Sequence, residues 1–233
     1  MNLSKRLQRV IANVKSGKTV ADIGCDHGFA SIALVQNGQA ERVIAMDINE
    51  GPLERARGHI SQYHMQDTIS VRLSDGAKKL QPGEADTLLI SGMGGALITK
   101  ILTDSKKTVM SAKELVLSPQ SEIHLVRKCV HELGFAIAHE EMVEDQGKYY
   151  VIIRAVPGRE RYADEIEYTY GKCLIEEKDA VFLQFLHKEE KRTDHILKHM
   201  SYEALSEEGM RKKAEIQKEK EQILAIRNRM CTE

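Results

Sequence analysis

The stretch VADIGCDHG, residues 20–28, begins inside a run of buried-type residues, Thr19 to Ile23, and ends where a helical pattern starts. It therefore predicts a strand, a tight turn and a helix that runs to about Val35. Glycines such as Gly24 and Gly28 suit a sharp bend where a ligand approaches main-chain atoms. Many strand–helix turns carry a glycine, so the stretch becomes informative only in combination with the later strand ends.

Short apolar runs alternate with helical patterns after this turn. Further strands are predicted at Arg42 to Asp47, Ile69 to Leu73, Thr87 to Ser91 and Glu114 to Ser118. Phe135 to Val143 and Lys148 to Val156 then flank a turn, which indicates a β-hairpin rather than another strand–helix unit. The chain is predicted to be an α/β protein, with a parallel sheet that ends in an antiparallel hairpin.

Pro157-Gly158 marks a change in composition, because the residues beyond it hold no further proline and are much richer in charge. One apolar stripe runs from Ile166 to Phe185 and another from Ile216 to Met230, with a break expected between Ser201 and Gly209. Two long antiparallel helices packed in coiled-coil fashion fit this pattern. The predicted domains are an α/β domain over residues 1–157 and a helical, coiled-coil-like domain over residues 158–233.

Charge and composition exclude several classes of protein. The chain has 34 Lys+Arg against 35 Asp+Glu, a net charge of −1, so it is not a globally basic protein that adsorbs to any nucleic acid. We expect no membrane span and no signal peptide, because no long apolar run occurs and the basic N-terminal segment lacks an apolar core. The four cysteines are far apart and form no Cys-x-x-Cys pair. Neither a metal site nor a disulfide framework is expected, and the cytoplasm is the predicted location.

Two further strand ends carry aspartates. Asp47 ends the second strand, 23 residues after Gly24, close to the separation of ~20 residues at which a carboxylate binds ribose hydroxyls. Asp75, followed by Gly76, comes directly after the third strand. Open α/β sheets bind ligands at the carboxyl ends of parallel strands. Each aspartate could instead cap a helix, but three acidic strand ends in this order are harder to explain by capping alone.

The charge of the first turn indicates what kind of ligand would bind. The turn reads Gly24-x-Asp26-x-Gly28 rather than Gly-x-Gly-x-x-Gly. Asp26 would repel the pyrophosphate of a dinucleotide, which has to approach this helix N-terminus closely. A cationic or zwitterionic ligand suits it better, and S-adenosylmethionine (SAM) carries an ammonium and a sulfonium. The antiparallel hairpin predicted at the end of the sheet also favours SAM over a dinucleotide.

Five motifs occur in one order: DIGCDHG, then MDI at 46–48, SDG at 74–76, ISGMGG at 90–95 and SPQ at 118–120. Together they resemble the Rossmann-like SAM-dependent methyltransferases, and more narrowly the bacterial tRNA (adenine(22)-N1)-methyltransferases, the TrmK family. The basic N-terminal helix and the helical tail are also similar, so the resemblance covers nearly the whole chain. Asp26 departs from the wider superfamily, in which many members carry a glycine there.

The resemblance implies roles for the residues of these motifs. It places Gly24, Asp26, His27 and Gly28 around the methionine part of SAM, Asp47 at the ribose hydroxyls, Ile48 on the adenine, and Asp75 with Gly76 at the adenine amino group. Ser91, Gly92, Met93 and Gly94 would form the rim where methyl donor and acceptor meet, with Ser91 and Gly92 also counted among the SAM-binding residues. The candidate catalytic residues, in positioning roles, are His27, Ser91, Gly92 and Met93. The candidate substrate-binding residues are Lys5, Arg6, Arg9, Gly94 and Gln120.

The chemistry can be argued separately from the resemblance. A sulfonium methyl is already activated, so an enzyme chiefly has to align the nucleophile and exclude water. Adenine N1 has an in-plane lone pair and carries no proton, so attack there needs no obligatory general base. Enzymes that methylate amino groups resemble one another in an Asn/Asp-Pro-Pro-aromatic loop after the fourth strand. This chain has Ser91-Gly92-Met93-Gly94 instead, which is compatible with methylation of a ring nitrogen.

Several candidate residues also have plainer explanations. His27 could be structural at a helix start, and Gln120 could serve a cap or a turn. Met93 could fill core space. Cys25 is interpreted as a packing residue because no paired base is evident. Tyr149-Tyr150 alternate on a strand, so at most one of them faces the site and neither is assigned.

RNA binding rests on local charge. Lys5, Arg6 and Arg9 form one basic cluster on the predicted N-terminal helix, and residues 211–220 carry five more basic residues. A solvated helical face with acidic partners nearby explains both clusters, and charge alone slightly favours that explanation. The resemblance shifts the balance toward tRNA as the partner, and the target base would have to be unstacked to reach the pocket.

The leading hypothesis is therefore a tRNA adenine-N1-methyltransferase that uses SAM. The alternatives are a SAM methyltransferase for another RNA, a small molecule or a protein, a nicotinamide-dependent oxidoreductase, and a non-catalytic RNA-binding scaffold. The oligomeric state stays open, because the tail could fold back on itself or pair with another chain; a monomer is favoured.

Overall fold

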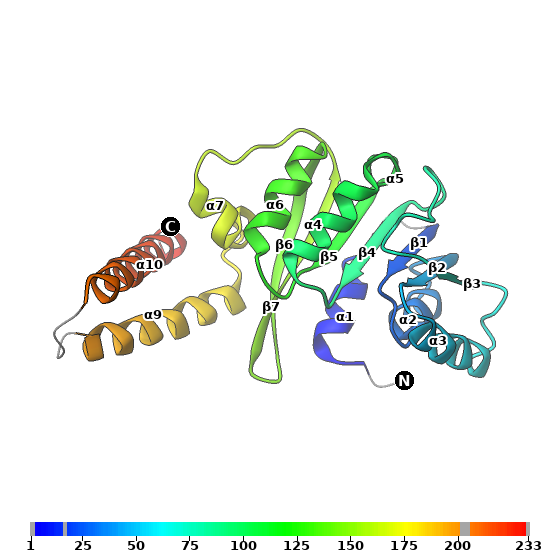
Figure 1. Ribbon diagram of the computed structural model, residues 1–233, viewed down its shortest axis with the longest axis horizontal. Coiled ribbons are helices and arrows are strands. Elements are labelled where there is room, and N and C mark those ends of the chain that lie inside the picture. The colour runs from blue at the N-terminus through cyan, green and yellow to red at the C-terminus, as the bar shows by residue number, and fades with distance from the viewer. Residues whose placement is uncertain (1–2, 16–17, 201–205, 232–233) are drawn as a thin grey trace. The chain divides into compact units, whose positions relative to one another are not determined.

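The computed structural model describes residues 3–15, 18–200 and 206–231. Among these residues, seven strands form one sheet in the order β3-β2-β1-β4-β5-β7-β6 (Figure 1). The strands are β1 (Thr19–Ile23), β2 (Arg42–Asp47), β3 (Ile69–Leu73), β4 (Thr87–Ser91), β5 (Glu114–Ser118), β6 (Phe135–Asp145) and β7 (Lys148–Pro157). The first five pair in parallel, and β7 pairs antiparallel to both β5 and β6. The predicted α/β sheet with a terminal hairpin is confirmed.

Helices cover the sheet and explain why its central strands are apolar. The helices of this part are α1 (Lys5–Ala12), α2 (Phe29–Gln36), α3 (Glu50–Gln62), α4 (Gly95–Asp104), α5 (Lys106–Met110), α6 (Ile123–Glu132) and α7 (Glu165–Tyr170). α2 contacts both α1 and α3, while α4 contacts α5 and α6 and lies beside α6 (Figure 1). Nearly every residue of β1, β4 and β5 is buried, as expected for parallel strands with helices on both faces. The short α5 was not among the predicted helices.

The β6–β7 hairpin turns at Gln146 and Gly147, where φ is +52° and +79°. Positive φ at both central residues is typical of a type I′ turn, whose twist matches that of the two strands. The paired strands run from Phe135↔Pro157 to Asp145↔Lys148, with one irregularity between Ile137 and His139. The hairpin thereby places Tyr149 and Tyr150 next to its turn, on opposite faces of the sheet.

The chain forms two compact units that divide between Thr169 and Tyr170. Composition places the change earlier, at Pro157-Gly158, and the domain boundary expected there remains a prediction. The second unit holds α8 (Lys172–Glu176), α9 (Ala180–Met200) and α10 (Glu207–Cys231). No helix within the described ranges is long and apolar enough to cross a membrane.

The prediction of one long helix from Ile166 onward is wrong. The chain breaks at Gly171, with φ +95°, and again at Lys178, with φ +53°, and α9 restarts where Asp179 Oδ1 accepts a hydrogen bond from Phe182 N at 2.7 Å. The apolar spacing continues across these breaks, which is why periodicity alone does not reveal them. The break expected between Ser201 and Gly209 includes residues 201–205, which lie outside the described residues.

The pairing of α9 with α10 is antiparallel, as predicted. Glu190 pairs with Arg227, while Arg192 pairs with Glu219. Partners later in α9 lie earlier in α10, which is the order that antiparallel helices require. These ion pairs are partly exposed to solvent and each contributes little to stability. The buried apolar side chains of α10 therefore carry most of the packing: Ile216, Ile223, Ile226 and Met230.

Candidate functional site

The carboxyl ends of β1, β2 and β3 are joined by main-chain hydrogen bonds. Gly24 N and Cys25 N donate to Met46 O at 2.7 and 2.9 Å, and Ser74 N donates to Asp47 O at 2.8 Å. The glycine turn, Asp47 and the Ser-Asp-Gly segment therefore share one edge of the sheet. This is the convergence that the sequence predicted for its acidic strand ends.

The turn after β1 is in direct contact with the turn after β4. Gly24 has φ +80°, and a Cβ added to it would overlap Cε of Met93. Its positive φ favours glycine at position 24, and the flexible end of the Met93 side chain packs against this turn. The contact brings together a residue predicted to bind SAM and a residue predicted to position the acceptor.

A buried carboxyl lies beneath this turn. Asp22, at the end of β1, is 4% exposed and accepts a hydrogen bond from Ser31 Oγ at 2.6 Å. Burial raises the pKa of Asp22 to about 6, while the Ser31 hydrogen bond opposes that rise. Burial also raises the pKa of the Cys25 thiol, which keeps it protonated at neutral pH and supports the packing interpretation. The sequence predicted a buried strand here but no titratable function.

We expect the stability of the protein to depend on pH through Asp22. Because its pKa is about 6 in the folded chain and near 4 in the unfolded one, its contribution is fully present below pH ~4 and is lost as the pH rises through 6. Asp22→Asn keeps an acceptor for Ser31 and removes the titration. Urea unfolding should show that the gain in stability from this substitution is about 2 kcal/mol larger at pH 7.5 than at pH 4.5. An equal difference at both pH values would contradict it.

The strand end after β2 offers a carboxylate beside an exposed apolar side chain. Asp47 Oδ1 accepts a hydrogen bond from Asn49 N at 3.0 Å. Ile48 is 59% exposed. An aliphatic side chain next to an acceptor at a strand end is the arrangement that an adenosine needs, with the ribose on the carboxylate and the base on the aliphatic face.

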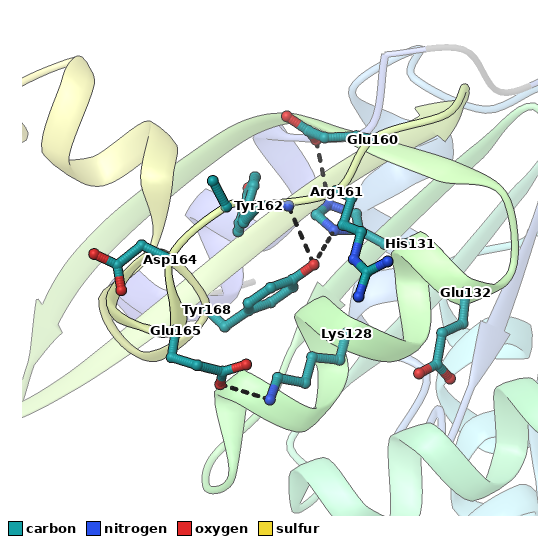
Figure 2. Close-up of a pocket in the computed structure, with 10 residues that line it drawn as sticks. Lys128, His131, Glu132, Glu160, Arg161, Tyr162, Asp164, Glu165 and Tyr168 are labelled. Carbon is teal, nitrogen blue, oxygen red and sulfur yellow. Dashed lines mark hydrogen bonds and ion pairs between the residues drawn. The ribbon is translucent and has the colours of Figure 1, made fainter.

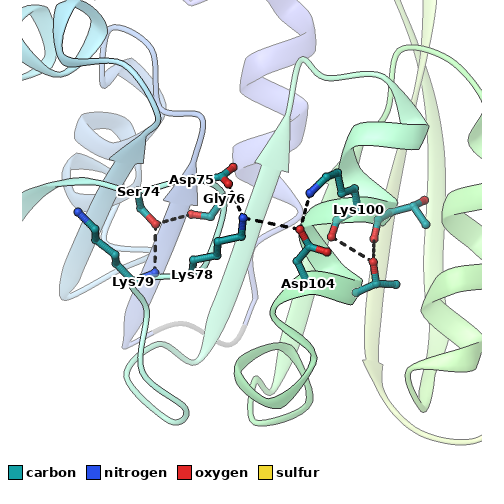
Figure 3. Close-up of polar contacts among 9 residues, drawn as sticks. Ser74, Asp75, Gly76, Lys78, Lys79, Lys100 and Asp104 are labelled. Atoms are coloured by element: carbon teal, nitrogen blue, oxygen red, sulfur yellow. Dashed lines mark hydrogen bonds and ion pairs between the residues drawn. The ribbon is translucent and has the colours of Figure 1, made fainter.

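The strand end after β3 contains an ion-pair network that the sequence did not reveal (Figure 3). Lys78 Nζ pairs with Asp75 and lies 3.8 Å from Asp104 Oδ2, which in turn pairs with Lys100 at 2.5 Å. Ser74 Oγ donates to Gly76 O at 2.9 Å. A ligand amino group that binds Asp75 would therefore either share the Asp75 carboxylate with Lys78 or displace Lys78 from it.

The segment after β4 runs alongside the segment after β5. Gly92 N donates to Ser118 O at 3.3 Å, and Gln120 N donates to Met93 O at 2.9 Å. The predicted rim from Ser91 to Gly94 is therefore supported through the main chain. Gln120 contributes its backbone here, and its side chain is exposed.

His27 lies at the surface of the first turn. Its side chain is 41% exposed, and Nε2 lies 3.6 Å from Asp26 Oδ2. Its ring stacks on Phe29 with 5.7 Å between centroids, and Phe29 stacks on His59 at 4.6 Å. Asp26 also lies 3.5 Å from Arg55, so the turn presents charge of both signs.

The three cations predicted to bind substrate have different environments. Arg9 forms a two-pronged ion pair with Glu141, Nε to Oε1 at 2.5 Å and Nη2 to Oε2 at 2.8 Å. Arg6 instead places its guanidinium 5.4 Å from the ring centroid of Tyr150. Lys5 is exposed. The sequence could not separate these residues, and it left Tyr150 unassigned.

A cavity of about 810 Å³ lies away from these motifs, between α6 and residues 160–168 (Figure 2). Two side-chain contacts cross it: Lys128 pairs with Glu165 at 2.6 Å, and His131 Nε2 lies 3.2 Å from Glu160 Oε2. These pairs attach the segment after β7 to α6, so we assign the cavity a structural origin. Across the described residues, no group of three or more His, Cys, Asp or Glu side chains is placed to hold a metal ion.

Comparison with known proteins gives consistent results. A family model described as a methyltransferase domain matches residues 3–153. The tRNA (adenine(22)-N(1))-methyltransferase of Bacillus subtilis is 34% identical over 221 residues, which cover 93% of each chain. The crystal structure of the B. subtilis m1A22 tRNA methyltransferase TrmK matches 97% of this chain and 99% of its own, at 31% identity and a TM-score of 0.84. A Streptococcus pneumoniae structure in complex with S-adenosyl-L-methionine matches 97% of this chain and all of its own, at 26% identity and a TM-score of 0.85.

Proposed function

The chain belongs to the family of bacterial tRNA (adenine(22)-N1)-methyltransferases, and we propose that it transfers a methyl group from SAM to N1 of adenine 22 in tRNA. The observation that carries this proposal is the contact between Gly24 and Met93. This contact joins the carboxyl ends of β1 to β3, which suit SAM, to the segment Ser91 to Gly94, where an acceptor base would meet the methyl group.

The residues at this edge fit SAM. Asp47 offers a carboxylate for the ribose hydroxyls, and the exposed Ile48 offers an apolar surface for the adenine. The turn from Gly24 to Gly28 has a glycine at each end, and its exposed Asp26 suits the ammonium of the methionine part. Asp75 accepts from the adenine amino group in this proposal, beside Lys78.

The reaction asks for positioning more than for proton transfer. When bound, SAM supplies a methyl group on a positively charged sulfur, so that the N–C bond forms as the S–C bond breaks and the base takes up the positive charge. Ser91, Gly92, Met93 and Gly94 would form the wall against which the adenine is placed in line with that methyl. Met93, packed on Gly24, would help to exclude water.

We further propose that residues 1–157 act as the methyltransferase domain and residues 158–233 as a helical domain, and that the protein works as a monomer in the cytoplasm. The monomer follows from the antiparallel pairing of α9 with α10 within one chain, which buries the apolar stripe of α10. Sedimentation of the protein with and without tRNA tests this point, and a stable dimer of the free protein would overturn it.

The test of the activity uses tritium-labelled SAM and unmodified tRNA. Label should enter the tRNA, mass mapping should place it as 1-methyladenine at position 22, and a tRNA with guanine at position 22 should stay unlabelled. Equal labelling of that control would overturn the proposal. Label in a small molecule or a protein but never in RNA would select the other SAM methyltransferases, and RNA binding without turnover would select the scaffold.

A further inference from the structure

Arg6 is directed to the rim by contacts from two distant parts of the chain. Its backbone N donates to Asp145 Oδ2 at 2.9 Å, which attaches the start of α1 to the turn of the β6–β7 hairpin. Its guanidinium carbon lies 5.4 Å from the ring centroid of Tyr150. Its Nη2 lies 4.0 Å from the point that a Cβ would occupy on Gly92. The guanidinium therefore lies beside the predicted rim.

The guanidinium of Arg6 has a buried donor without an acceptor in the part of the chain that the structure describes. Its Nη1 is buried and has no hydrogen-bond partner among the described residues. Buried donors in folded proteins are almost always satisfied, so an orphaned one indicates a missing partner. Arg9, three residues later on the same helix, shows the contrast, because Glu141 and the Arg9 side chain satisfy each other. An oxyanion beside Gly92 would supply to Arg6 what Glu141 supplies to Arg9.

We propose that Arg6, supported by Tyr150, binds an oxyanion at the methyl-transfer rim. The planar fork of a guanidinium matches the oxygens of a phosphate or a carboxylate, and the bare backbone of Gly92 leaves room for either. The inference rests on the proposed function, in which both ligands carry such a group: the phosphodiester beside the target adenosine, and the carboxylate of SAM. Tyr150 is a positioning residue, which acts through the cation that its ring face holds.

The test compares Arg6→Gln with Lys107→Gln, a control that removes an exposed cation from α5, a helix to which no site residue is assigned. Initial rates give kcat and KM for tRNA at several salt concentrations, and calorimetry gives Kd for SAM. Arg6→Gln should lower kcat/KM about 10- to 100-fold, the value of a hydrogen bond to a charged group. Lys107→Gln should change kcat/KM less than 3-fold.

The two sources of the oxyanion give different results. If Arg6 binds the phosphodiester, KM for tRNA rises in Arg6→Gln, the slope of log KM against log salt falls by about 1, and Kd for SAM is unchanged. If it binds the carboxylate, Kd for SAM rises and the salt slope is unchanged. Either result supports the site. Wild-type values for both ligands in a folded Arg6→Gln protein would overturn it.

Three further variants keep the proposal falsifiable if Arg6→Gln fails to fold. Arg6→Lys keeps the charge but loses the forked pair of donors. It should weaken the same ligand, tRNA or SAM, that Arg6→Gln weakens, but by a smaller factor. Tyr150→Phe keeps the ring face and should behave like wild type, whereas Tyr150→Leu should lose about 2- to 5-fold of that affinity. Equal behaviour of the two Tyr150 variants would overturn its positioning role. Absence of tRNA methylation by the wild-type protein would instead refute the proposed function.

Discussion

Replacing Asp47 with alanine is expected to weaken SAM binding about 100-fold and to lower tRNA methylation in the same proportion when SAM is below saturation. The carboxylate at the end of β2 would accept hydrogen bonds from both ribose hydroxyls, and each hydrogen bond to a charged group contributes about 1.5–3 kcal/mol. Its contact within the chain is local, from Asn49 N, so the fold should tolerate the change. Calorimetry with SAM measures the loss directly.

Asp67→Ala is the matched control for this experiment. Asp67 is an exposed aspartate just before β3, so it lies at the amino ends of the parallel strands, while Asp47 lies at their carboxyl ends. The control should bind SAM like wild type. Asp47→Asn keeps one acceptor oxygen, so its affinity for SAM should lie between those of wild type and Asp47→Ala. Unchanged affinity in Asp47→Ala would show that the ribose is held elsewhere.

Replacing Arg127 with methionine is expected to destabilise the first unit by about 3–5 kcal/mol. Arg127 is 1% exposed, and its Nε donates to Oε1 of the fully buried Glu140 at 2.7 Å. Its Nη1 also donates to Tyr168 O and Thr169 O at 2.7 and 3.0 Å. The substitution strands a buried carboxylate and leaves two carbonyls without their donor, so the thermal midpoint should fall by roughly 10 °C.

Two variants separate the buried charge from the lost packing. Arg127→Met combined with Glu140→Leu removes both charges and should recover much of the stability, because paired buried charges gain little over apolar residues of similar size. Lys128→Met, at the neighbouring surface pair with Glu165, should cost less than ~1 kcal/mol. A midpoint for Arg127→Met within 2 °C of wild type would contradict the assigned role.

Local pattern was sufficient for most of the fold. Apolar runs of five or six residues between glycine and proline signals gave the strands, and the change from helix units to alternation gave the hairpin. The acidic strand ends were predicted to converge, since parallel strands end at one edge of a sheet. The first tail helix was predicted too long, because Lys178 adopts a positive φ that its side-chain chemistry does not signal.

The sequence by itself determined the α/β class and the order of the motifs at the ends of the parallel strands, because these depend on spacing within short segments. It also predicted the edge of the sheet at which we propose that SAM binds. Only the tertiary structure decided between Arg6 and Arg9. The two arginines have the same charge and lie on the same helix. The carboxylate that pairs with Arg9 belongs to Glu141, which lies 132 residues later in the chain. Likewise Lys78, which lies after β3, reaches Asp104 at the end of α4. The type and charge of each residue can be read from the sequence. Whether a charged side chain already has a partner depends on which distant residue the fold brings beside it.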